Sequence, residues 1–146
     1  MNANHSTNHK IKGLEELAGL LRDEQAKDRK VTLCHGVFDL LHIGHIRHFE
    51  QARKFGDVLA VTTTPDQFVN KGFGRPAFNE RLRAEALAAL SCVDYVAINQ
   101  WPTAVETIRL LRPDYYVKGS DYAHAADDRT GGITLEFQEL IKEGQP

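Results

Sequence analysis

The sequence has 146 residues, of which 42% are apolar, enough for one domain with a buried core and too few for several domains. Its 18 basic and 20 acidic side chains give a formal net charge of -2, which provides no electrostatic argument for binding nucleic acid or an anionic membrane. No apolar run approaches the roughly 20 residues that span a bilayer, and the polar start lacks a signal-peptide core, so a cytoplasmic protein is expected.

The first third of the sequence predicts a polar lead followed by the start of one domain. Residues 1–10 are rich in Asn, His, Ser and Thr, which predicts a disordered lead before a single domain over 11–146. Apolar side chains recur at helical spacing over 14–25 and predict a packing helix. The β-prone run 31–34 then predicts the first strand, and helical spacing over 43–55 predicts the helix that follows it.

The remaining sequence continues this alternation of strands and helices. The predicted elements are a strand at 58–63, a helix at 80–90 with Asn79 as its N-cap, a strand at 95–98, a helix at 101–111, a strand at 115–117 and a last helix at 135–142. The basic, glycine-containing segment 65–78 predicts a mobile loop. The alternation predicts an α/β fold, a Rossmann-like parallel sheet with helices on both faces and the strand order 3-2-1-4. Ligands of such sheets bind beyond the carboxyl ends of the strands.

Two motifs at the first strand and its helix carry the chemistry. Gly36-Val37-Phe38-Asp39 follows the strand, and His42-Ile43-Gly44-His45 opens the helix. Backbone donors, the positive end of the helix dipole and two imidazoles would converge there, which suits a phosphate group. Gly44 would let the ligand approach the backbone closely. Asp39 has two interpretations, as a carboxylate that orients backbone amides, which we favour, or as one that contacts Mg²⁺ through water.

Other cysteines and histidines near these motifs indicate no metal site. Cys34, His35, His42 and His45 have the right chemistry for zinc but lack the paired spacing of a closed zinc site. His35 and His48 are expected to be packed or solvated. Cys34 and Cys92 form no disulfide pattern and are expected to be buried thiols. We therefore expect no protein metal ligands.

The sequence resembles the cytidylyltransferase-like superfamily of nucleotidyltransferases, which is marked by a GxFD strand end and an HxGH helix start. Both motifs are intact here. Within that superfamily it looks most like the nucleotidyltransferase domains of ADP-heptose synthases. That likeness rests on Leu14-Glu15-Glu16-Leu17, GVFDLLHIGH and Val117-Lys118-Gly119-Ser120-Asp121-Tyr122.

The resemblance implies a transfer, assisted by Mg²⁺, of a nucleoside monophosphate from a nucleoside triphosphate to a sugar phosphate. Pyrophosphate would leave, an NDP-sugar would form, and no covalent enzyme intermediate is needed. His42 and His45 would stabilise the transition state, together with Lys71 on the loop after the second strand.

The resemblance also assigns residues to the walls of the crevice. Arg81 matches an arginine of the family's helix motif, whereas Arg83 is expected at the surface. The other expected nucleotide- and phosphate-binding residues are Gly36, Val37, Phe38, Asp39, Gly44, Lys118, Gly119 and Asp121.

Several alternatives stay open at this point. ATP is favoured as the nucleotide, and cytidylyl transfer from CTP to a sugar or alditol phosphate is the close alternative. A homodimer and a fused or separate sugar kinase domain are further expectations from the resemblance. The resemblance implies a further strand and a Ser/Thr-rich segment, which we expect this sequence to lack, so a nucleotide-binding module without turnover is the alternative of another class. A dinucleotide-binding oxidoreductase is excluded, because it needs GxGxxG where Gly36-Val37-Phe38-Asp39 stands.

Overall fold

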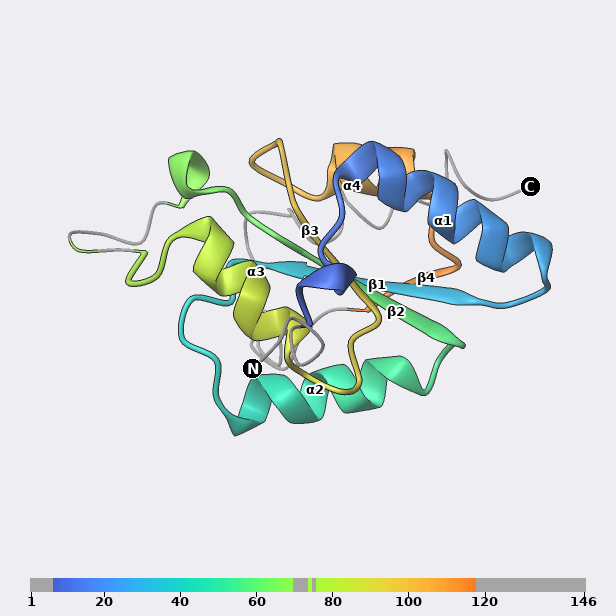
Figure 1. Cartoon of the computed structure of the whole chain (residues 1–146), viewed down its shortest axis with the longest axis horizontal. Helices are drawn as coiled ribbons and strands as arrows, with labels where there is room; N and C mark the ends of the chain where they lie inside the picture. Colours follow the sequence, from blue (N-terminus) through green and yellow to red (C-terminus); the bar gives the residue numbers. More distant parts are fainter. Residues whose placement is uncertain (1–6, 70–73, 75, 118–146) are drawn as a thin grey trace, which may run out of the picture.

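The computed structural model describes residues 7–69, 74 and 76–117, and the structural statements below concern those residues. At its centre is a parallel sheet with the strand order β3-β2-β1-β4 (Figure 1). The strands are β1 (Val31–Gly36), β2 (Val58–Thr63), β3 (Tyr95–Ile98) and β4 (Tyr115–Tyr116). Their pairing runs from Val31 opposite Val58 to Gly36 opposite Thr63 in the two central strands. The predicted parallel sheet and its order 3-2-1-4 are confirmed.

Helices cover both faces of this sheet (Figure 1). One face packs against α1 (Leu14–Ala26) and α4 (Val105–Leu111), and the other against α2 (Ile43–Arg53) and α3 (Glu80–Ala88). Successive side chains of a strand point to opposite faces. In β1, Val31 and Leu33 therefore join the core beneath α1 and α4, whereas Cys34 joins the core beneath α2 and α3. The predicted Rossmann-like α/β fold is confirmed.

The sequence patterns explain why these elements form. All six positions of β2 are buried, as expected for a central parallel strand that helices cover on both sides. α1 buries four side chains at helical spacing: Leu14, Leu17, Ala18 and Leu21. α3 begins after Asn79, whose side chain accepts the N–H of Leu82 at 2.9 Å, so the predicted N-cap is confirmed.

The disorder predicted for residues 1–10 is contradicted at residues 8–10. Residues 1–6 lie outside the described residues, but Asn8–Lys10 forms a 3-10 helix rather than a disordered segment. Ile11 pairs with Val96 of β3, and the Lys12 N–H donates to the Val96 carbonyl at 2.8 Å. The edge of β3 offers these backbone partners, and local composition gave no sign of them.

The helix predicted at 101–111 begins later, at Val105. The side-chain amide of Asn99 donates to the carbonyls of Trp101 at 2.8 Å and Thr103 at 3.0 Å. These contacts hold the backbone in a turn before α4, where a helix would need its carbonyls for its own hydrogen bonds. The helix predicted at 135–142 lies outside the described residues.

Aspartates anchor the amino ends of the strands, at the edge of the sheet opposite the two motifs. Each accepts a backbone N–H at 2.8 Å: Asp57 from Lys30, Asp94 from Leu59, and Asp114 from Val31. These carboxylates satisfy N–H groups at or just before the starts of β1 and β2. The opposite edge, beyond the carboxyl ends of the strands, is where open α/β sheets bind their ligands.

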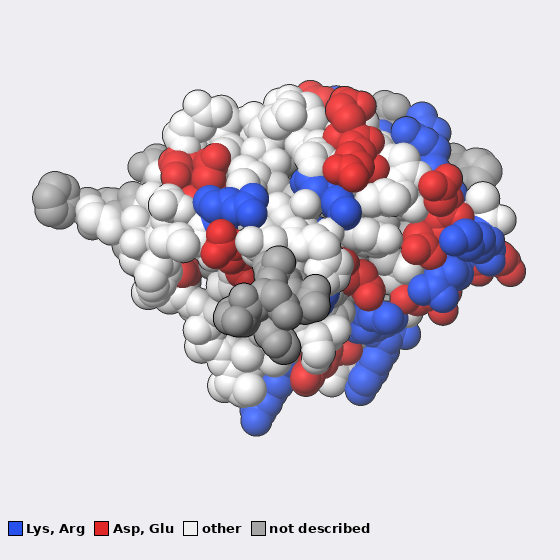
Figure 2. All heavy atoms as spheres, viewed as in Figure 1, with Lys and Arg blue, Asp and Glu red and all other residues white. Residues whose placement is uncertain are grey.

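The charged surface has no dominant sign on the face shown in Figure 2, where acidic and basic side chains lie interspersed. That distribution agrees with the near balance of charges in the sequence. An anionic ligand therefore needs a local set of donors. Among the helices of the described segments, none has the length and apolar character to cross a membrane.

Candidate functional site

The loop that joins β1 to α2, residues 37–42, starts in a conformation that packing stabilises. Phe38 has a φ of 53°, in the left-handed region, which costs a non-glycine residue about 1 to 2 kcal/mol. Its ring packs edge-on against Phe49 at 5.1 Å and His45 at 5.8 Å between ring centroids. A Cβ on Gly36 would lie 2.8 Å from the Phe38 ring, so any other residue there would displace that ring. The ring of Phe38 thus connects this loop to the start of α2.

Two histidines cap the start of α2 reciprocally. His42 is the N-cap, and its Nδ1 accepts the N–H of Gly44 at 3.0 Å. The Nδ1 of His45 accepts the N–H of His42 at 3.2 Å, and the two ring centroids lie 4.1 Å apart. An imidazole nitrogen that accepts carries no proton, so each neutral ring has its proton on Nε2. Two Nε2–H donors therefore belong to the positive end of α2, where an anion is stabilised.

Gly44 has a reason to be glycine that the sequence did not reveal. A Cβ there would lie 2.7 Å from Cε1 of His42 and 3.0 Å from its Nδ1. The space that the sequence suggested for a ligand is occupied by the capping imidazole. Gly44 therefore serves the helix cap, because it lets the His42 ring fold over the first turn.

Asp39 is buried and joins the β1–α2 loop to the segment before α3. Its Oδ2 accepts the N–H of Ala77 at 2.7 Å, and its Oδ1 accepts the N–H of Phe78 at 2.9 Å. This geometry supports the interpretation of Asp39 as a carboxylate that orients backbone amides. The amides belong to a distant segment rather than to its own turn.

The described residues do not assemble the zinc ligands that the sequence suggested as an alternative. Cys34 is buried, its Sγ lies 3.6 Å from Nε2 of His48, and burial raises the pKa of its thiol to about 12. His35 instead pairs through Nδ1 with the Thr62 hydroxyl at 2.8 Å. In the described segments, no group of three or more His, Cys, Asp or Glu side chains could hold a metal ion.

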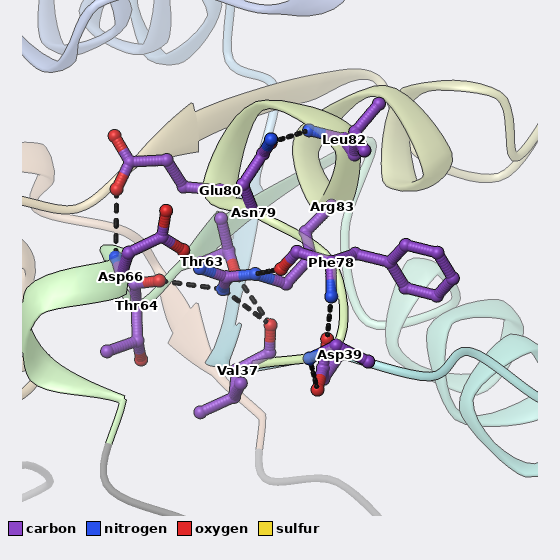
Figure 3. Close-up of polar contacts among 11 residues, drawn as sticks. Val37, Asp39, Thr63, Thr64, Asp66, Phe78, Asn79, Glu80, Leu82 and Arg83 are labelled. Atoms are coloured by element: carbon purple, nitrogen blue, oxygen red, sulfur yellow. Dashed lines mark hydrogen bonds and ion pairs between the residues drawn. The ribbon is translucent and has the colours of Figure 1, made fainter. Parts of the chain in front are cut away.

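Arg83 is buried, so its expected place at the surface is wrong. The residue is 1% exposed, and its guanidinium donates to the carbonyls of Val37 at 3.0 Å, Thr64 at 2.7 Å and Phe78 at 2.9 Å. It also forms an ion pair with Asp66 at 2.6 Å (Figure 3). Buried Leu87 lies one helical turn further along α3, on the same face. The spacing of four residues between Arg83 and Leu87 was the available sequence signal for burial. It was not decisive, because an arginine is seldom buried without partners, and the partners of Arg83 lie far away in the sequence.

A polar groove opens beside this cluster, between the carboxyl ends of β2 and β3 and the start of α3. Its volume is about 810 Å³, and its lining residues are Pro65, Asp66, Gln67, Asn79, Glu80, Arg81, Ile98, Asn99 and Gln100. Arg81 is half-exposed and forms an ion pair with Glu85 at 3.2 Å. The Asp66 N–H donates to Glu80 at 2.8 Å, which connects the segment after β2 to the start of α3 (Figure 3). Amide, carboxylate and guanidinium side chains thus line the groove, although Asn79 and Asn99 already bond within the protein.

The structure brings one part of the expected site together and leaves another part undescribed. The two motifs, from Gly36 to His45, meet at the carboxyl end of β1, and Arg81 lines the neighbouring groove. The remaining expected residues, Lys71, Lys118, Gly119 and Asp121, lie outside the described residues. Sequence reasoning missed Thr63, Thr64, Asp66 and Arg83, because their partners come from other elements.

Comparisons with known proteins agree with this geometry. A model of the family described as Cytidylyltransferase-like matches residues 33–145. The protein named bifunctional protein HldE is 44% identical over 115 residues in Geobacter metallireducens, covering 77% of this chain and 24% of that protein. HldE of Campylobacter curvus is 44% identical over 122 residues, covering 82% of this chain and 26% of that protein. The chain thus spans about a quarter of the length of these curated relatives.

A solved structure is similar as well. The lipopolysaccharide core biosynthesis protein from Thermoplasma volcanium GSS1 superposes with a TM-score of 0.60 and 27% sequence identity. The match covers 73% of this chain and 88% of that one. The likeness therefore extends over most of both chains.

Proposed function

The chain belongs to the cytidylyltransferase-like family of nucleotidyltransferases, and from this premise we propose that it transfers a nucleoside monophosphate from a nucleoside triphosphate to a sugar phosphate. ATP is the favoured donor, and the products would be an NDP-sugar and pyrophosphate. The observation that carries this proposal is the reciprocal cap of His42 and His45. It places two imidazole donors and the positive end of α2 beside one loop.

The reaction that fits this arrangement is a direct displacement at the α-phosphorus. An oxygen of the acceptor phosphate forms a bond to that phosphorus while the bond from it to the bridging oxygen of the β-phosphate breaks. Pyrophosphate carries the electron pair away, so the chain needs no nucleophile of its own. The Nε2–H groups of His42 and His45 would donate to the phosphate oxygens as charge develops on them. Catalysis then rests on charge stabilisation and on alignment of the two substrates.

We assign the polar groove to the acceptor. Its lining amides and carboxylates match the hydroxyl groups of a sugar, and the guanidinium of Arg81 matches an anionic group. Arg83 contacts both Val37, in the β1–α2 loop, and Asp66, in the groove lining. The groove and the loop therefore lie together at the carboxyl edge of the sheet. Lys71, Lys118, Gly119 and Asp121 stay predictions from the resemblance, as further phosphate contacts.

Mg²⁺ belongs to the proposal through the resemblance alone. Both carboxylate oxygens of Asp39 accept backbone N–H groups, and the described residues hold no cluster of three metal ligands. Magnesium in nucleotide sites keeps several waters and binds the substrate phosphates, so it needs few protein ligands. We therefore assign no described residue to the ion, which would arrive on the triphosphate.

The test is a panel of ATP, CTP, GTP and UTP crossed with sugar 1-phosphates and alditol phosphates, scored by release of pyrophosphate. ATP with a sugar phosphate should give the highest rate, EDTA should abolish it, and added Mg²⁺ should restore it. A preference for CTP would replace ATP by the alternative donor. Stabilisation of the fold by a nucleotide without any product would instead identify a binding module without turnover.

The relatives suggest the setting in which this domain works. They are named bifunctional, and this chain corresponds to about a quarter of their length. We propose that a sugar kinase domain, fused or separate, supplies the phosphorylated acceptor. Self-association into a homodimer is a separate prediction, which sedimentation of the purified protein tests.

A further inference from the structure

Arg83 lies where three segments of the chain meet, and the proposed reaction has given it no role. Its side chain has no exposed surface. Its Nε donates to Phe78, its Nη1 donates to Val37, Thr63 and Thr64, and its Nη2 donates to Asp66 (Figure 3). A buried guanidinium is tolerated when its donors are satisfied, and here each nitrogen has an acceptor.

Each of these three segments leads to a part of the proposed site. Val37 starts the loop that ends at His42, the N-cap of α2. Asp66 lines the groove, and Phe78 directly precedes Asn79, which lines it as well. One guanidinium therefore contacts the loop that carries the imidazoles and two segments that border the groove.

A second buried group connects the same segments in the opposite direction. Asp39, in the β1–α2 loop, accepts the N–H groups of Ala77 and Phe78 at 2.7 and 2.9 Å. Arg83, on α3, donates to the Phe78 carbonyl at 2.9 Å and to the Val37 carbonyl at 3.0 Å. Residue 78 is thus held through both its N–H and its carbonyl, which fixes its orientation relative to the loop.

We propose that Arg83 is a positioning residue for the transfer reaction, which fixes the distance between the imidazoles at the start of α2 and the acceptor groove. This inference rests on the proposed function. Arg83 touches neither substrate and acts through Val37 and Asp66. A displacement of about 1 Å between reacting groups can slow a reaction on the order of a hundredfold. The alignment of the two substrates therefore depends on this side chain.

The role needs the guanidinium group and not only a positive charge. A guanidinium presents five N–H donors in fixed directions within one plane, whereas lysine has a single ammonium nitrogen. In Arg83→Lys the ammonium can stay opposite the Asp66 carboxylate. It cannot also reach the carbonyls of Val37 and Phe78, so the groove and the β1–α2 loop lose their common contact.

The experiment compares steady-state kinetics of the full chain with those of Arg83→Lys, with nucleotide binding measured separately by calorimetry. Arg109→Lys is the matched control, because Arg109 forms an exposed ion pair on α4, on the other face of the sheet. Arg83→Lys should lower kcat on the order of a hundredfold and change KM and nucleotide affinity much less, since each substrate still has its own contacts. Arg109→Lys should leave kcat and KM unchanged.

A purely structural role gives a different result. It predicts that the folded fraction falls while kcat per folded molecule stays at the wild-type value, and that a stabilising osmolyte restores activity. That result would overturn the inference. A wild-type protein that releases no pyrophosphate overturns the proposed function itself, whereas an active wild type with an unchanged kcat in Arg83→Lys overturns only the positioning role.

Asp66→Asn keeps the test decisive if Arg83→Lys does not fold. The Asp66 side chain is 41% exposed, and its asparagine replacement leaves the other contacts of Arg83 in place. This variant should lower kcat per folded molecule about tenfold, because only one side of the link is weakened, and its melting temperature should fall, because the buried guanidinium loses its counter-charge. Where both single variants fold, the double variant should be no slower than Arg83→Lys, since the two residues act through one link. Wild-type kcat in Asp66→Asn, or additive losses in the double variant, would contradict the inference.

Discussion

Replacing His42 by alanine and by asparagine separates the two roles of its ring. In His42→Ala the Gly44 N–H loses its acceptor, and loss of an N-cap costs about 1 kcal/mol, within a range of roughly 0.5 to 2. The Nε2–H donor to the phosphate is lost as well. A hydrogen bond to a charged group is worth about 1.5 to 3 kcal/mol. If it acts in the transition state, kcat should fall roughly 10- to 100-fold.

His42→Asn should restore one role and not the other. Asparagine is among the best N-cap residues, so the free energy of unfolding should return to within about 0.5 kcal/mol of the wild type. Its shorter side chain engages the backbone and does not replace the imidazole donor, so kcat should stay as low as in His42→Ala.

Urea denaturation measures the cap and pyrophosphate release measures the donor, with His9→Ala as a control at an exposed histidine outside α2. Recovery of activity in His42→Asn would refute the donor role. Unchanged stability in His42→Ala would refute the cap.

Three further substitutions or measurements test the surroundings of the site. Gly44→Ala should lower kcat, because its Cβ would lie 2.7 Å from the His42 ring, whereas Gly19→Ala in open space on α1 should only stabilise, by up to about 1 kcal/mol; equal behaviour in kinetics and urea melts would contradict this. Asp39→Asn should destabilise by about 1 to 3 kcal/mol in urea melts, since one of two buried N–H groups loses its acceptor; wild-type stability would show that the contacts do not form. Burial raises the pKa of Cys34 from 9.0 to about 12, so the unfolded chain releases this proton first. The free energy of unfolding contributed by this pKa shift is fully present below about pH 9 and is lost as the pH rises towards 12. Native Cys34 should also resist alkylation at pH 8, and rapid labelling would contradict its burial.

The sequence alone was sufficient for the strands and most of the helices of the described residues, and for the order of the strands in the sheet. β2 and β3 have the predicted bounds, 58–63 and 95–98, because each is a short β-prone run between residues that break strands. Asn79 caps α3 as predicted. The HxGH segment stands at a helix start, where phosphate chemistry was expected. These features are encoded within a few neighbouring residues, so periodicity and capping signals reveal them.

Only the tertiary structure decided which side chains hold the site together. The resemblance assigned Arg81 to the site and left Arg83 at the surface, yet Arg83 is the buried residue, with a partner 46 positions away at Val37. Asp39 accepts amides 38 and 39 positions away. The role of Gly44 depends on how the His42 ring folds, and α4 begins late because of the Asn99 side chain. Such contacts depend on how separate elements pack, and no local pattern of residues specifies which distant donor will meet which acceptor.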